Sequence, residues 1–116
     1  MRLEARKYLY DIQEAAALAA QFTAGKNFEE YARDAMLRMA VERAFAIIGE
    51  AMAQLARIDS ALAEKITNLK NIIAFRNVLV HAYAQIDNRI VWGIVESELP
   101  ILILEVTALM NAEDEM

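Results

Sequence analysis

The chain of 116 residues has no cysteine, one proline, three glycines and one histidine. Without cysteine it has no disulfide framework and no thiolate chemistry, and one histidine makes a zinc-type site a poor expectation. No uninterrupted run approaches the roughly 20 apolar residues of a membrane-spanning helix. The opening stretch, residues 1–7, lacks the apolar core of a signal peptide. We therefore expect a cytoplasmic protein that uses neither a metal nor another cofactor.

Proline and glycine, which break helices, are scarce in this chain, and apolar residues are in excess. Hydrophobic residues make up 58% of the chain, above the roughly 45–50% of ordinary globular chains. Abundant Ala, Leu, Ile and Met favour an all-helical bundle, and the length predicts one domain over residues 1–116. An alanine-rich core is the alternative explanation of this excess. A buried interface between two copies explains it more simply, so we expect a homodimer formed through helical faces.

The charge balance is acidic, with a net charge of −5. Phosphate contacts need clustered Lys and Arg, so this balance argues against a broad nucleic-acid-binding face but leaves room for a local basic cleft. Three negative charges belong to Glu113, Asp114 and Glu115, within an acidic tail over about 111–116 that we predict to be a solvated end.

Apolar spacing predicts the first helices. One helix covers about 3–22, and a turn follows at Gly25. Asn27 has Glu30 three residues later, which is typical of a capping box at the start of the next helix. That second helix is expected to run without a break over about 28–58. Its apolar positions surround much of its circumference, which indicates that it is covered on several sides.

The pattern in the second half of the sequence predicts three more helical segments. Asp59 or Ser60 caps a short one, and a longer one covers about 67–82. Asp87 caps a final helix that reaches about residue 111 and is kinked at Pro100, because proline removes one helical hydrogen bond and clashes with the preceding turn. The expected architecture is an antiparallel four- to five-helix bundle.

The most informative polar residues are Arg76, His81 and Tyr83, near the end of the 67–82 helix. Ideal helix geometry puts Arg76 in the middle of an apolar face with Tyr83 nearly in line, and His81 about 140° away. Asn77 precedes His81 by four residues, so its amide can orient the imidazole. An ideal helix keeps Arg76 and His81 apart. Either the helix unwinds near His81, or two copies contribute to one cleft.

These residue types suit phosphodiester chemistry. RNA is cleaved without a metal when its 2′-hydroxyl attacks the adjacent phosphorus. An imidazole can accept that proton or supply one to the leaving oxygen, and a guanidinium can neutralise the charge that develops on the phosphorane. Structural roles are the alternatives: His81 as a helix C-cap, Arg76 as a partner of Glu42 or Glu50, and Tyr83 as a plug at the end of the core.

The Arg-x4-His-x-Tyr pattern resembles that of the HepT-like toxins of the HEPN superfamily. The segment 43–51, Val91-Trp92 and Leu99-Pro100 resemble the flanking segments of the same family. The resemblance implies a homodimeric, metal-independent endoribonuclease toxin of a type VII toxin–antitoxin system, with RNA as substrate and Arg76 and His81 in a composite site. It also implies that a MntA-like minimal nucleotidyltransferase neutralises the toxin by adding AMP to Tyr83.

The chain departs from the family pattern in two places. Ala82 stands where an acidic residue is frequent, and the segment 66–70 lacks the usual Pro-Trp pair. Two rival interpretations remain beside the enzyme: a non-catalytic, nucleotide-binding helical subunit of a two-component nucleotidyltransferase, and a purely structural bundle. The latter accounts for the apolar excess but not for Arg76 within an apolar stripe.

Overall fold

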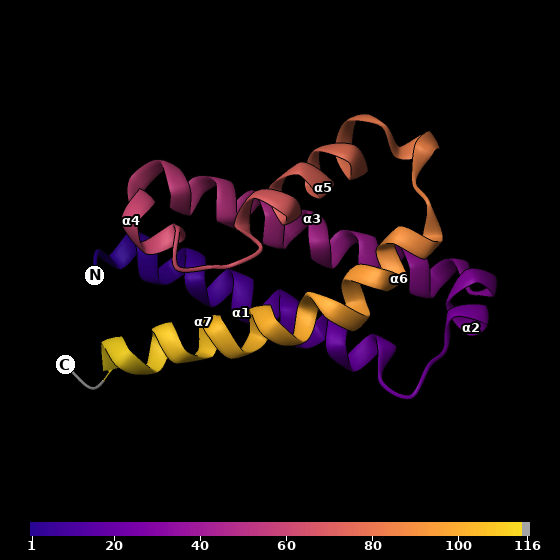
Figure 1. The fold of residues 1–116 in the computed structure, drawn as a ribbon, viewed down its shortest axis with the longest axis horizontal. Coiled ribbons are helices and arrows are strands. Elements are labelled where there is room, and N and C mark those ends of the chain that lie inside the picture. The colour runs from indigo at the N-terminus through magenta and orange to yellow at the C-terminus, as the bar shows by residue number, and fades with distance from the viewer. Residues whose placement is uncertain (115–116) are drawn as a thin grey trace.

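The computed structural model describes residues 1–114, with side chains through Ala112, and this part of the chain is helical without a β-strand (Figure 1). The all-helical prediction is confirmed. The predicted acidic tail continues into residues 115–116, which lie outside the described residues. The helices are α1 (Leu3–Thr23), α2 (Phe28–Arg33), α3 (Ala35–Ile58), α4 (Ser60–Ala63), α5 (Leu69–His81), α6 (Asn88–Ser97) and α7 (Leu99–Asp114), and a 3₁₀ turn η1 (Tyr83–Gln85) follows α5.

The two long helices α1 and α3 form the centre of the bundle. Helix α7 packs on α1, and α5 packs on α3, so α5 and α7 lie on different partners (Figure 1). The predicted apolar stripe of α3 is fully or almost fully buried: Leu37, Val41, Phe45, Ile48, Met52 and Leu55. Burial of each such side chain contributes about 1.5–3 kcal/mol. This core fixes the face that α3 turns to α1.

The predicted continuous helix over 28–58 is wrong, because it is broken at Asp34. This residue leaves the helical region (φ −106°, ψ 98°), and its carboxylate accepts a hydrogen bond from the backbone N–H of Leu37 at 3.1 Å. A carboxylate that caps a new helix competes with continuation of the old one. The capping box at the start of α2 is confirmed, with the Glu30 N–H donating to Asn27 at 2.8 Å.

The final predicted helix is interrupted, as expected from its proline, but the break precedes Pro100. Helix α6 ends at Ser97 and α7 starts at Leu99, so Pro100 occupies the first turn of α7. A proline is tolerated there because its missing N–H would have no intrahelical partner. The predicted cap by Asp87 is confirmed by its hydrogen bond from the Arg89 N–H at 2.8 Å.

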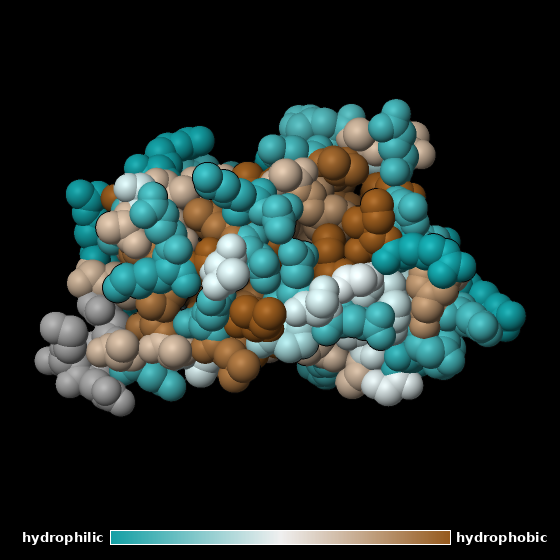
Figure 2. All heavy atoms as spheres, viewed as in Figure 1, coloured by the Kyte–Doolittle hydropathy of each residue, from teal (hydrophilic) through white to brown (hydrophobic). Residues whose placement is uncertain are grey.

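Part of the apolar excess lies on the surface. Met36 and Met39 on α3 are 81% and 72% exposed, and Leu104 on α7 is 72% exposed. Figure 2 shows brown, apolar surface over the first turns of α7 and between α5 and α6, amid teal polar surface. No helix within residues 1–114 is both long enough and apolar enough to cross a membrane.

Candidate functional site

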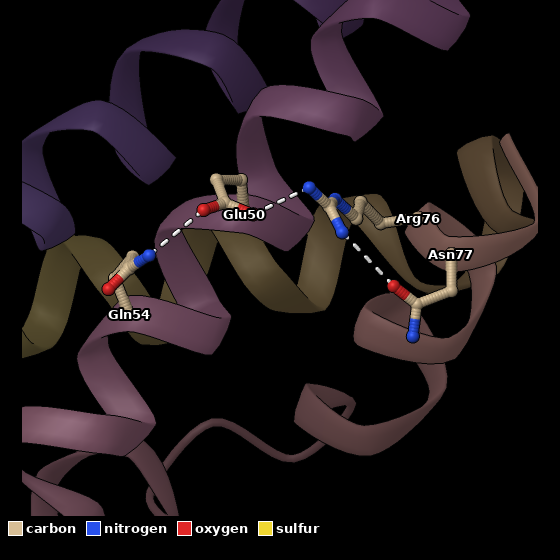
Figure 3. Close-up of polar contacts among 4 residues, drawn as sticks. All are labelled: Glu50, Gln54, Arg76 and Asn77. Atoms are coloured by element: carbon tan, nitrogen blue, oxygen red, sulfur yellow. Dashed lines mark hydrogen bonds and ion pairs between the residues drawn. The ribbon is translucent and has the colours of Figure 1, made fainter. Parts of the chain in front are cut away.

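The guanidinium of Arg76 joins α5 to α3 through a short polar network (Figure 3). Its Nη2 lies 2.7 Å from Oε2 of Glu50, and its Nη1 donates to Oδ1 of Asn77 at 3.1 Å. Gln54, one turn further along α3, donates to the other oxygen of Glu50 at 3.0 Å. Glu50, rather than Glu42, is therefore the partner of Arg76. Burial raises the pKa of the Glu42 carboxyl, against the opposing effect of nearby Arg38.

Gly49 makes the close contact between α3 and α5 possible. A Cβ atom at this position would lie 2.2 Å from Cβ and 2.7 Å from Cγ of Arg76, and 3.3 Å from the carbonyl oxygen of Ile72. The aliphatic stem of Arg76 thus occupies the space that a side chain at position 49 would need. Gly49 sets how deeply Arg76 sits against α3, and it places Glu50, the next residue, within reach of the guanidinium.

Gly49→Ala is expected to destabilise the fold by about 1–3 kcal/mol, because the added methyl group overpacks the contact with Arg76. Thermal unfolding followed by circular dichroism measures the effect. The matched control is Gly93→Ala in α6, where an added Cβ meets no atom within 4 Å. That control should be neutral or stabilising, since alanine favours a helix over glycine by about 1 kcal/mol. A Gly49→Ala variant that melts at or above the parent temperature would contradict the packing argument.

Arg76 lies in a groove of about 290 Å³ between α1, α3 and α5. The groove combines two cations with two carboxylates, so it is locally mixed in charge rather than broadly basic. Its lining consists of Tyr8, Asp11, Arg43, Ala46, Ile47, Glu50, Ala51, Gln54, Arg76 and Val80. The contributions of α1 were not predicted. The pattern of one helix does not reveal which polar positions of another helix will lie beside it.

His81 is the last residue of α5 and is exposed. It is not among the residues that line the groove, and its side chain forms no hydrogen bond or ion pair within residues 1–114. The helix does not unwind ahead of it, because the N–H of Ala82 still donates to the carbonyl of Val78 at 2.9 Å. One chain therefore does not bring Arg76 and His81 together. The Asn77 amide contacts Arg76 in this structure and not His81.

Tyr83 lies in η1, beyond the end of α5, and is 74% exposed. The expectation that it continues the line of Arg76 assumed a helix that reaches residue 83. The chain leaves the helix at Ala82 (φ −134°, ψ 40°), so that expectation is wrong. The alternative that Tyr83 plugs the core is also wrong. Its hydroxyl-bearing ring is open to solvent.

No three His, Cys, Asp or Glu side chains gather as a metal site requires in the described part of the chain. The structure places the three predicted site residues as an arginine held in a groove, an exposed histidine at a helix end and an exposed tyrosine just beyond it.

The all-helical fold and the Arg-x4-His pair at the end of a short helix agree with the family resemblance drawn from the sequence. The model of the HepT-like ribonuclease family, "Ribonuclease HepT-like", matches residues 12–109, and the chain belongs to this family. It is 36% identical to "Putative RNase MJ1380" of Methanocaldococcus jannaschii over 89% of this chain and 94% of that protein. It is 34% identical to "Probable ribonuclease HepT" of Thermococcus cleftensis over 88% of this chain and 92% of that protein. No solved structure matches the chain significantly.

Proposed function

We propose that this ribonuclease cleaves RNA without a metal, at a composite site to which one copy contributes Arg76 and another contributes His81. The observation that supports the composite site is the separation of the two residues in one chain: Arg76 lines the groove and His81 does not. Family membership supports RNA as the substrate class.

The chemistry follows from the donors and acceptors. His81 accepts the proton of the 2′-hydroxyl as its oxygen attacks the adjacent phosphorus, and the bond from phosphorus to the 5′-oxygen breaks. A water molecule supplies a proton to the leaving 5′-oxygen, and the protonated His81 later returns its proton to solvent, so the products carry a 2′,3′-cyclic phosphate and a 5′-hydroxyl. Arg76 stabilises the charge on the phosphorane oxygens. A guanidinium has five N–H donors. Glu50 and Asn77 engage two of these donors on Arg76, so other donors remain free to bind a phosphate. The hydrogen bond to Asn77 supports the orientation of the guanidinium.

Exposed apolar residues beside the groove support a homodimer. Ile47 and Val80 line the groove and are 37% and 44% exposed. Met36 and Met39 project toward the same side of α3 as Arg43, since ideal helix geometry separates each of them from Arg43 by about 40° or less. We propose that a second copy covers part of this face and brings its His81 to Arg76.

Regulation by a MntA-like minimal nucleotidyltransferase antitoxin is the second part of the proposal, which makes the chain the toxin of a type VII toxin–antitoxin pair. The hydroxyl of Tyr83 attacks the α-phosphorus of ATP, an O-AMP-tyrosine forms and pyrophosphate leaves. The exposure of Tyr83 supports this role, because a modifying enzyme needs access to the hydroxyl. The added bulk and negative charge then exclude an RNA phosphate.

The ion pair between Arg76 and Glu50 favours a second candidate function. An arginine that is already paired suits a non-catalytic, nucleotide-binding subunit that presents substrate to a nucleotidyltransferase. The two functions differ in turnover, since only the enzyme converts excess RNA to product.

Incubation of the purified chain with excess RNA in the presence of a chelator tests the proposal. We expect multiple turnovers and fragments that end in 2′,3′-cyclic phosphate and begin with 5′-hydroxyl. Cleavage that requires an added divalent cation would contradict the metal-independent mechanism. Nucleotide binding without any cleavage would favour the subunit.

A further inference from the structure

The groove contains a carboxylate and a guanidinium that have no side-chain partner within residues 1–114. Asp11 on α1 and Arg43 on α3 both line it, and within residues 1–114 neither forms an ion pair or a side-chain hydrogen bond. Glu50 and Arg76, in the same groove, are paired with each other. A free carboxylate and a free guanidinium in one groove suit a ligand that carries both N–H donors and an anionic group.

Tyr8 adds an aromatic wall to this groove. It precedes Asp11 by one turn of α1, so the two side chains are neighbours on the helix surface. The ring is partly buried and packs against the core, which limits its freedom. The volume of about 290 Å³ lies at the small end of ligand pockets, where one nucleotide, rather than a larger group, is accommodated.

We propose that the groove binds one nucleotide of the RNA and that Asp11 makes it select guanine. This inference rests on the proposed function for the identity of the substrate. The base lies against Tyr8, as unstacked RNA bases commonly lie against aromatic side chains. The Asp11 carboxylate accepts hydrogen bonds from the base edge, and Arg43 binds a phosphate of the same strand.

Guanine fits an acidic acceptor better than the other bases. Its Watson–Crick edge carries two adjacent donors, N1–H and the exocyclic amino group, which match the two oxygens of a carboxylate. Adenine and cytosine offer only an amino group at this edge beside an acceptor nitrogen. Uracil offers one N–H between two carbonyl oxygens that repel a carboxylate. A good bidentate pair gives discrimination of roughly five- to a hundredfold.

Binding of uncleavable oligonucleotides tests the assignment independently of catalysis. The probes are 2′-fluoro oligouridylates with one central position changed to guanine, adenine or cytosine, together with the unchanged oligomer. Fluorescence anisotropy gives the affinity of each for the parent and for three variants, Asp11→Asn, Arg43→Gln and the control Glu14→Gln. Glu14 is exposed on α1 and is not a lining residue of the groove.

We expect the parent and Glu14→Gln to prefer the guanine probe by roughly tenfold or more. Asp11→Asn should lose that preference, and Arg43→Gln should lower the affinity for all four probes by the same factor. A parent that binds the four probes equally, or an Asp11→Asn variant that keeps the preference, overturns the inference. If the guanine preference depends on Asp11 but the all-ribose counterpart is not cleaved, the base site stands and the proposed catalysis fails.

Discussion

His81→Ala is expected to slow RNA cleavage by roughly 10²–10⁴-fold, the usual contribution of a positioned proton-transfer group. The same change should leave the fold intact, because the His81 side chain is exposed and forms no hydrogen bond or ion pair within residues 1–114. Single-turnover cleavage of a defined RNA in chelator measures the rate, and circular dichroism measures the melting temperature. If the His81→Ala variant cleaves RNA as fast as the parent, His81 is not a catalytic residue.

Arg76→Ala is a less clean test of the same site. Its side chain packs against Gly49 and pairs with Glu50, so its removal changes both the α3–α5 contact and a carboxylate in the groove. We therefore rest the catalytic prediction on His81, where loss of activity cannot be attributed to loss of packing.

Tyr83→Phe is expected to abolish AMP addition by the proposed nucleotidyltransferase antitoxin, because it removes only the acceptor oxygen and keeps an exposed aromatic ring. The variant should fold and cleave RNA, and it should escape neutralisation. Intact mass spectrometry after incubation with the partner and ATP measures the adducts on the parent and the variant. Tyr10→Phe is the control. Tyr10 on α1 is also exposed, at 53%, but the Tyr10→Phe variant should still receive AMP on Tyr83.

An AMP adduct that persists on Tyr83→Phe would refute the switch. The same conclusion would follow if peptide mapping placed the adduct on Tyr8, Tyr10 or Tyr31. Tyr31 is fully buried against Trp92, with ring centroids 5.2 Å apart, so its modification would also require local unfolding.

The sequence predicted most of the helices because their apolar residues recur at helical spacing over several turns. The α3 stripe from Leu37 to Leu55 is buried as predicted. The break at Asp34 was missed because the apolar pattern continues through it, and only the local competition between a carboxylate cap and the helix ends α2 there. Short-range polar contacts of this kind leave little trace in periodicity.

The surroundings of the candidate site could be predicted only in part. Arg76, His81 and Tyr83 are recognisable as polar residues near the end of an apolar helix, and the sequence offers Glu42 and Glu50 as partners of Arg76. The choice between Glu42 and Glu50 depends on the register of α5 on α3, which Gly49 permits and which is not encoded in either helix alone. Tyr8 and Asp11 were missed for the same reason, because α1 meets α3 only in the folded bundle.

Mixing two inactive variants tests the composite site most directly. Arg76→Ala and His81→Ala are unfolded together, refolded as a mixture and assayed for RNA cleavage in chelator. In a mixed dimer one cleft regains an intact Arg76 from one copy and an intact His81 from the other. Random pairing then restores roughly a quarter of the parent activity, since half of the dimers are mixed and each has one working cleft. Activity that stays at the level of the separate variants, although mixed dimers form, would contradict a site shared between two copies.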